Sequence, residues 1–330
     1  MNHSRRHALA LLVSPLMDTL PRSGLAQQPG QLPVVGVLST GSESGPHPLV
    51  DAFKDGLKEH GLVDGRTVRL VVVYSGGKSE RLPDLVRVLV AEGARVIVTG
   101  GTTQVSAAHR AAPNTPIVMW GSADPVLMGF AQSLARPGGH ITGISILGFE
   151  LFSKWLQLLK EAVPTARAFF ALLQVTNPAT VEFRRTLDDA GRKLGVRIEP
   201  RDIAAVEDIP ATLDDAVRQS IDGVLVVSDP FFFKHRETLF RQAIERRLPT
   251  IVGSDGLARA GTLLAYALDF PAIARRSSYY VSKILGGADP ATLPIEQPSV
   301  LRMTVNLKTA KLIGVTIPPL MLARADEVIE

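Results

Sequence analysis

The chain contains no cysteine in its 330 residues. This absence excludes disulfide bonds, thiolate metal ligands, a cysteine nucleophile and a lipid attached through an N-terminal cysteine. Long apolar runs are missing too, because no segment approaches the roughly 18 consecutive apolar residues of a membrane-spanning helix. We therefore expect no stable insertion into a membrane. The length predicts about two domains at the usual size of 100 to 200 residues each.

No excess charge of one sign gathers anywhere along the chain. The 36 Lys and Arg residues are scattered among 32 Asp and Glu, which leaves a net charge of only +4. A surface that follows phosphates needs a basic block or stripe with interleaved aromatic residues, so we expect no nucleic-acid partner. The hydrophobic fraction of 45% and the charged fraction of 21% are typical of a folded globular protein.

The common catalytic motifs are absent as well. The segment Gly253–Gly256 does not have the G-x-S-x-G order of a nucleophile elbow, and Gly100–Thr103 lacks the lysine of a phosphate-binding loop. No G-x-G-x-x-G follows the first predicted strand, and no two histidines after residue 26 have the helical spacing of metal ligands. We expect a protein that is not an enzyme and that uses no metal or cofactor.

The N-terminus has the order of a secretory signal. Arg5 and Arg6 precede an apolar stretch over residues 8–17, and the small-residue pattern Gly24-Leu25-Ala26 follows it. Ten apolar residues are too few to span a bilayer, which needs about 20. The sequence therefore predicts a signal peptide over residues 1–26, cleaved near Ala26. The pair Arg5-Arg6 leaves both the general and the twin-arginine export route open.

From residue 33 onward, short β-branched apolar runs alternate with segments of helical period. This alternation predicts βαβ units with buried parallel sheets, hence an α/β fold of two doubly wound parallel-sheet lobes joined by a hinge that the chain crosses several times. The predicted boundaries are 33–143 plus about 263–291 for the first lobe, and 144–262 plus about 292–330 for the second. The predicted helices cover residues 49–60, 81–91, 103–111, 151–162, 180–194, 209–219, 237–246 and 272–285.

Small, hydroxylated and acidic residues follow the predicted strands. Because parallel strands end at the same edge of a sheet, these residues are expected to meet and to bind a ligand there. Glycine admits close approach of a ligand, Ser and Thr supply hydrogen bonds, and helix N-termini favour anions. The alternative is that they only form turns and helix caps. The candidate ligand-binding residues are Ser39, Thr40, Ser42, Thr102, Thr103, Trp120, Asp124, Asn177, Asp229, Phe231 and Asp255.

Several longer segments resemble one known family in their order along the chain. They are GLKEHGLVDGRTVRL, DPVLMGFAQSLARPGGHITG, RLPTI and the closing segment from LPIEQPSV to ADEVIE. These segments are similar to the ABC transporter substrate-binding protein family that includes tryptophan- and tyrosine-binding members. The resemblance covers about residues 33–330. It departs from the family pattern at His140, where asparagine is usual, and at Trp120 and Phe231–Phe233, which are less typical.

The resemblance implies a fold and a function for the chain. It implies the type 1 fold of periplasmic binding proteins, capture of a small amino acid or organic acid between two lobes, and delivery to an ABC permease with its ATPase subunit. It also implies that the strand-end loops supply the ligand contacts. A ligand-sensing subunit for a membrane receptor has the same fold and stays an alternative, as does a secreted hydrolase in which Asp124, Asp229 and Asp255 act as acid and base.

In a hinged binding protein the solute contacts both lobes only when they close, so its affinity shifts the open and closed populations. Asp229 and Asp255 are candidates to accept an amino group, and hydroxyls with helix amides to receive a carboxylate. The ring of Phe231 is a candidate to stack on a flat solute, as is that of Trp120.

Overall fold

A computed structural model describes residues 31–146, 151–298 and 301–330, and for Asp255 it describes the backbone only. The predicted signal peptide over residues 1–26 lies outside the described residues. Within the described part, no helix is both long and apolar enough to cross a membrane.

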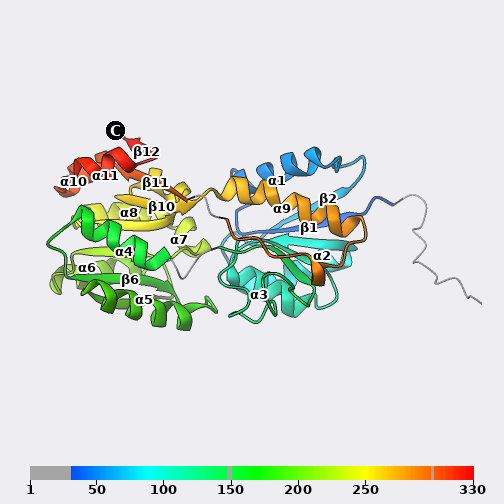
Figure 1. Ribbon diagram of the computed structural model, residues 1–330, viewed down its shortest axis with the longest axis horizontal. Helices are drawn as coiled ribbons and strands as arrows, with labels where there is room; N and C mark the ends of the chain where they lie inside the picture. The colour runs from blue at the N-terminus through cyan, green and yellow to red at the C-terminus, as the bar shows by residue number, and fades with distance from the viewer. Residues whose placement is uncertain (1–30, 147–150, 299–300) are drawn as a thin grey trace, which may run out of the picture. The chain divides into compact units, whose positions relative to one another are not determined.

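The first sheet, whose strands β1 and β2 are labelled in Figure 1, has five strands, all parallel, in the order β2-β1-β3-β4-β5. The strands are continuous apolar runs, because helices cover both faces of the sheet. Their bounds are β1 Val34–Ser39, β2 Arg69–Tyr74, β3 Ala94–Thr99, β4 Ile117–Trp120 and β5 Ile141–Ile144.

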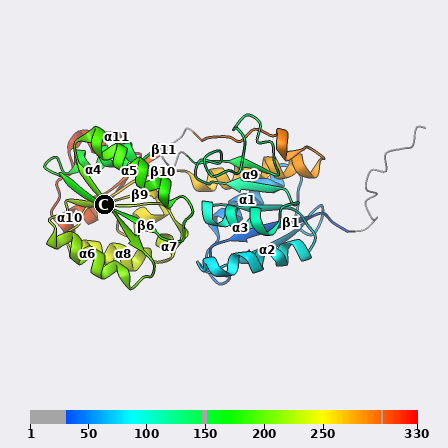
Figure 2. The ribbon, with the colours of Figure 1, turned by 90° about the horizontal axis from the view of Figure 1, so that it is seen from below.

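The helices of this sheet lie two on each face, and they follow the alternation of side chains along each strand. In β4, Val118 and Trp120 point to the side of α1 and α9, whereas Ile117 and Met119 point to the side of α2 and α3. Figure 2 shows the same two helix layers. We call this sheet with its helices the first lobe. The helix bounds are α1 Pro48–Glu59, α2 Leu82–Ala91, α3 Thr102–Ala111 and α9 Phe270–Leu285, with the short 3-10 segments η1 Ser79–Arg81 and η3 Pro290–Thr292.

The second sheet has seven strands in the order β12-β11-β10-β9-β8-β6-β7. Strands β6 to β10 are parallel, β11 joins β10 in the antiparallel sense, and β12 pairs with β11 in the parallel sense. Pro200 lies within β7, which is an edge strand, where a residue without an N–H is tolerated. The bounds are β6 Ala168–Gln174, β7 Arg197–Ile203, β8 Gly223–Val226, β9 Thr250–Ser254, β10 Leu264–Leu268, β11 Leu301–Asn306 and β12 Glu327–Ile329.

Helices cover both faces of the second sheet as well. α4 and α5 pack on one face, and α6 and α8 on the other (Figure 2). We call this sheet with its helices the second lobe. The bounds are α4 Leu151–Ala162, α5 Thr180–Leu194, α6 Asp208–Arg218, α7 Pro230–Lys234, α8 Arg236–Glu245, α10 Leu307–Ile313 and α11 Pro319–Arg324, with the 3-10 segment η2 Asp255–Ala260.

The two-lobed α/β prediction is confirmed, but one boundary was wrong. The range 263–291 was assigned to the first lobe, whereas β10 within it belongs to the second sheet. The part of the range from α9 onward packs on the first lobe as predicted. An apolar run identifies a buried strand but not the sheet that it joins. The change of lobe follows β10 directly, at Asp269, whose carboxylate accepts a hydrogen bond from the Ala272 N–H at 2.9 Å and caps α9.

Three smaller differences concern short elements. β5 and β12 were not predicted as strands. The sequence predicts a last helical segment that starts near Leu307 and ends around Pro318 and Pro319, whereas the structure has a shorter helix, α10, and then a further helix, α11. β5 has only four residues and β12 only three, so their apolar patterns are too short to identify from the sequence. α10 ends at Ile313 because Gly314 adopts a left-handed backbone with φ of 77°.

The chain returns to the second lobe after Glu296, and this return is held by polar contacts to α9. The Glu296 carboxylate accepts hydrogen bonds from Arg276 at 2.7 and 3.1 Å, and this guanidinium lowers the pKa of Glu296. The Tyr280 hydroxyl donates to the carbonyl of Pro294 at 2.9 Å, and burial raises the pKa of Tyr280. The segment before the return is therefore fixed to the first lobe.

The second residue after helix α8 has a strained backbone, which gives a stability prediction. Arg247 has φ of 55°, while its N–H donates to Ile244 and the N–H of Leu248 donates to Ala243, both at 2.9 Å. Glycine adopts this left-handed position without strain, so Arg247→Gly is expected to stabilise the fold by about 0.5–1 kcal/mol in urea unfolding. Arg241→Gly inside the same helix is the control and is expected to destabilise by about 1 kcal/mol. Destabilisation by both variants would contradict the assignment.

Candidate functional site

Both lobes have the same strand order, and that order indicates where a ligand binds. Taken in chain order from β6, the second sheet reads 2-1-3-4-5-6-7, so its first five strands repeat the 2-1-3-4-5 order of the first sheet. In each case the direction of winding reverses between the first and third strands, so the loops after these strands open a crevice at the carboxyl edge. The relevant loops follow β1 and β3 in the first lobe, and β6 and β8 in the second. Eight of the eleven predicted residues lie at the ends of these strands, in these loops or in the first turn of the helix that follows: Ser39, Thr40, Ser42, Thr102, Thr103, Asn177, Asp229 and Phe231.

In the second lobe, two predicted residues meet at this reversal point. The Nδ2 of Asn177 donates to Oδ2 of Asp229 at 2.8 Å, while Oδ1 of Asp229 accepts from the Phe231 N–H at 2.8 Å and caps α7. Asn177 is itself fixed, because its Oδ1 accepts from the Ala179 N–H at 2.9 Å. The two loops are therefore tied together by an amide–carboxylate pair.

The electrostatic state of Asp229 is unusual for a surface loop. Burial raises the pKa of its carboxyl, and the hydrogen bonds from Phe231 and Asn177 oppose that shift only in part. Among the described residues, no Lys, Arg or His forms an ion pair with it. A desolvated carboxylate without a counter-charge is costly to maintain, and it favours any cation that reaches it.

Phe231 lies directly beside this pair, at the start of α7. Its ring is half-buried and packs edge-to-face on Phe232 with ring centroids 5.3 Å apart, and the His235 ring lies 4.8 Å away on a tilt. Phe232 is fully buried in the core and Phe233 is 44% exposed, so the three rings have three different environments. Only Phe231 combines an accessible ring surface with a fixed position next to Asp229.

In the first lobe, the loops after β3 and β4 are joined through Thr102. Its buried Oγ1 accepts from the Ala123 N–H at 3.1 Å, which leaves its own hydroxyl proton free to donate elsewhere. Thr103 is half-buried in the first turn of α3. Asp124 caps the next turn, where its Oδ1 accepts from the N–H groups of Val126 and Leu127 at 2.9 and 3.1 Å.

The remaining predicted residues of the first lobe have different surroundings. Ser39 is half-buried, and its Oγ accepts from the Gly41 N–H at 3.3 Å; the Thr40 carbonyl accepts from the Gly77 N–H at 2.9 Å. Ser42 is exposed. Trp120 is only 6% exposed and packs edge-to-face on Phe53 at 5.8 Å, so its ring belongs to the core of the first lobe.

Asp255 begins η2, and its side chain lies outside what the structure describes.

Two serines at this edge, Ser122 and Ser145, are not among the residues predicted from the sequence. Ser122 and Ser145 follow β4 and β5, both are fully buried, and their hydroxyl groups have no hydrogen-bond partner within the described residues. Buried hydroxyls are normally hydrogen-bonded, so these two add unused polar capacity at the carboxyl edge of the first lobe. No sequence signal separates them from ordinary turn serines.

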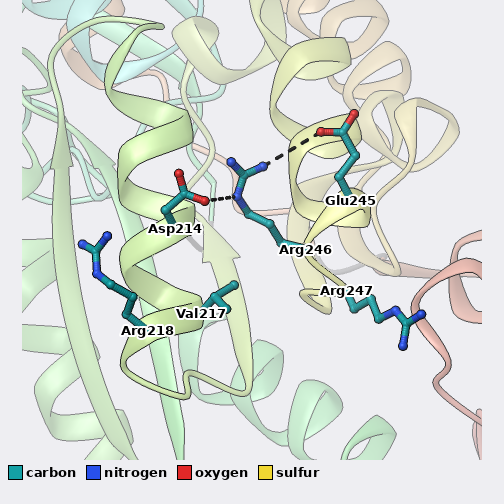
Figure 3. Close-up of a pocket in the computed structure, with 6 residues that line it drawn as sticks. All are labelled: Asp214, Val217, Arg218, Glu245, Arg246 and Arg247. Atoms are coloured by element: carbon teal, nitrogen blue, oxygen red, sulfur yellow. Dashed lines mark hydrogen bonds and ion pairs between the residues drawn. The ribbon is translucent and has the colours of Figure 1, made fainter.

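A hollow of about 550 Å³ lies elsewhere, between the C-terminal ends of α6 and α8 (Figure 3). Arg246 lies between Asp214, at 2.8 Å, and Glu245, at 4.0 Å, whereas Arg218 and Arg247 extend away from the middle. The C-terminal ends of these helices lie at the amino edge of the sheet, opposite the strand-end loops. With its central guanidinium already paired, this hollow is not the predicted solute site.

Two parallel-sheet lobes of one strand order, connected by a chain that passes between them more than once, define the type 1 fold of periplasmic binding proteins. The family model described as ABC transporter substrate binding protein matches residues 35–329, so the chain belongs to that family. The resemblance drawn from the sequence motifs is thereby confirmed. Members of this family bind solutes and are not enzymes, which agrees with the missing catalytic motifs.

The individual relatives share about a fifth of their residues with this chain. The tyrosine-binding protein of Clostridioides difficile strain R20291 is 22% identical over 269 residues, which cover 80% of this chain and 77% of the relative. A solved ABC domain in complex with L-Trp from Streptococcus pneumoniae has a TM-score of 0.83 and 22% identity, covering 91% and 100% of the two chains. A conserved domain protein of Vibrio cholerae has the same TM-score and identity, covering 90% and 100%. At these identities the structural likeness establishes the fold.

Proposed function

We propose that this chain is the exported solute-binding component of an ABC importer and that its solute is an amino acid with a flat or apolar side chain. The solute binds between the strand-end loops of the two lobes and is released unchanged to a membrane permease with its ATPase subunit. The predicted signal over residues 1–26 supports a periplasmic location.

The observation that carries this proposal is the state of Asp229. Its side chain is half-buried, its carboxylate accepts hydrogen bonds from an amide and a backbone N–H, and no cation of the described part of the chain neutralises it. An ammonium group supplies the missing charge through a charge-assisted hydrogen bond, which is strong in such a desolvated place. The solute is therefore expected to carry an amino group.

The first lobe offers a site for the carboxylate of the solute, at the start of α3. The first turn of α3 contains Thr102 and Thr103, and the first N–H groups of a helix have no partner within the helix. These N–H groups, the helix dipole and the free proton of the Thr102 hydroxyl together suit a carboxylate. An ammonium at Asp229 and a carboxylate at α3 describe a zwitterionic amino acid that contacts both lobes at once.

Phe231 contacts the side chain of the solute. An aromatic ring that is fixed edge-to-face on Phe232 presents a flat apolar surface to a second ring or a branched alkyl group. Relatives named for tyrosine binding and solved with L-Trp are consistent with an aromatic amino acid. We therefore rank L-tryptophan and L-tyrosine first among the solutes.

A thermal-shift screen of the purified protein tests this function. At a hundred times its dissociation constant a solute stabilises the folded state by about 2.7 kcal/mol, which raises the unfolding midpoint by roughly 5 °C. L-tryptophan or L-tyrosine is expected to give such a rise and to be recovered unchanged after long incubation. No rise with any amine-bearing compound would remove the proposal, and conversion of the solute would favour a hydrolase.

A further inference from the structure

Two histidines that are 31 positions apart in the sequence meet on the first lobe. His109 lies in the last turn of α3, and His140 lies directly before β5. The Nδ1 of His109 is 3.3 Å from the Nε2 of His140, and the rings stack with centroids 5.0 Å apart and planes 21° apart. Both residues are half-buried, so solvent reaches the pair.

The separation of the two ring nitrogens matches the requirement of a shared metal ion. Two imidazole nitrogens bound to one tetrahedral Zn²⁺ at about 2.0–2.1 Å each are about 3.3–3.4 Å apart. The nitrogens of His109 and His140 already have this separation. A small rotation of the rings is enough to direct both lone pairs at one ion in place of the hydrogen bond between them.

The backbone of His140 and the ring of His109 are held in place by their surroundings. The carbonyl of His140 accepts from the Ile117 N–H at 2.8 Å, which fixes its backbone against β4. The ring of His109 packs edge-to-face on Phe130 at 6.1 Å. The site is thus organised before any ion arrives.

We propose that His109 and His140 form a two-imidazole binding site for a divalent transition metal ion. No third His, Asp or Glu completes a cluster anywhere in the described ranges, so the other ligand positions belong to water. Imidazole ligands suit Zn²⁺, Ni²⁺ and Cu²⁺, whereas Mg²⁺ and Ca²⁺ require oxygen. The site is expected to discriminate between these two groups of ions.

This site is separate from the proposed solute site. His109 ends α3 and Thr102 begins it, which puts about 10 Å of helix between them at 1.5 Å per residue. His140 precedes β5 and therefore lies at the amino edge of the sheet, opposite the strand-end loops. Metal binding is expected to stabilise the first lobe and to leave the response to solute unchanged.

Calorimetric titration of the untagged full chain with Zn²⁺ tests the site. His109→Gln and His140→Asn each remove one ligand and are expected to weaken this binding by at least about tenfold, and the double variant to bind no more strongly than either single variant. His60→Gln removes an exposed histidine of the same lobe and is expected to change nothing. Zn²⁺ is also expected to raise the unfolding midpoint of the wild type and of His60→Gln only.

Equal Zn²⁺ affinity in the wild type and both single variants would overturn the site, as would the absence of a Zn²⁺-dependent rise in the midpoint. Failure of His140→Asn to fold leaves His109→Gln, at the half-exposed end of α3, as the deciding variant. A wild type that binds Mg²⁺ as strongly as Zn²⁺ would also contradict a site made of imidazoles. None of these results depends on the identity of the solute.

Discussion

Asp229→Asn is expected to weaken binding of the amino-acid solute by about 30-fold or more, because removing one partner of a buried charge pair costs about 2–5 kcal/mol. The substitution keeps the acceptor that caps α7 through the Phe231 N–H. It loses the carboxylate and puts an amide N–H₂ opposite the Nδ2 of Asn177, which donates to it in the wild type. Isothermal titration with L-tryptophan or L-tyrosine measures the loss.

The matched control is Asp214→Asn, which removes a carboxylate of the same lobe. Asp214 lies in α6 and pairs with Arg246, which directly follows α8. Solute affinity is expected to be the same in this control as in the wild type. An equal loss of affinity in both variants would assign the effect to general destabilisation. Unchanged affinity in Asp229→Asn would show that the ammonium binds elsewhere.

The affinity is also expected to depend on pH through the same carboxyl. Burial raises the folded-state pKa of Asp229 above its ordinary value of 3.8, so the folded protein holds this proton at a higher pH than the unfolded chain. Binding of an ammonium needs the ionised form, and affinity should fall as pH drops through the raised pKa. The stability of the empty protein has the opposite dependence: the contribution of Asp229 is present below the unfolded pKa and is lost as pH rises through the folded pKa. Asp229→Asn should remove both effects.

Gly143→Ala is expected to produce the largest loss of stability. Gly143 lies in β5 with φ of 119°, a conformation that residues with a side chain rarely adopt. A Cβ there would lie 2.6 Å from the backbone N of Met119 and closer still to its carbonyl oxygen, and the backbone of β4 cannot yield. Strain of about 1–3 kcal/mol and overpacking of about 1–3 kcal/mol add to a loss of roughly 2–6 kcal/mol in urea unfolding.

Gly139→Ala is the matched control, because a Cβ at Gly139 meets no atom within 4 Å. Its free energy of unfolding is expected to stay within about 0.5 kcal/mol of the wild type, as for most surface substitutions. A small effect at both positions would mean that β5 does not pack on β4 as described.

The sequence predicts the long elements well, because their signals are periodic. The predicted helices over 151–162 and 180–194 coincide with α4 and α5, and the strand-end loops are where the alternation puts them. β10 shows the limit of this reasoning. A buried apolar run of five residues predicts a strand. Which of the two sheets the strand joins depends on its pairing with β9 and β11, which the run itself does not indicate.

The sequence predicts the sheet edge at which the candidate residues lie, but it does not predict how their side chains contact one another. The sequence selected Asn177 and Asp229 because each follows a strand, but their mutual hydrogen bond depends on the strand order that makes β6 and β8 neighbours. For Trp120 the predicted position at the end of β4 is correct, but the predicted contact of its ring with a solute is not, because the ring packs on Phe53 in the core. The direction of a side chain at a strand end depends on local turns that periodicity does not reveal.

The most direct test is a calorimetric comparison of L-tryptophan with two analogues, tryptamine, which lacks the carboxylate, and indole-3-propionate, which lacks the ammonium. If both charged ends of a zwitterion are recognised, L-tryptophan binds, and each analogue is weaker by about 100-fold or more. Indole-3-propionate that binds as tightly as L-tryptophan would contradict the account, because Asp229 would then have no cationic partner to receive.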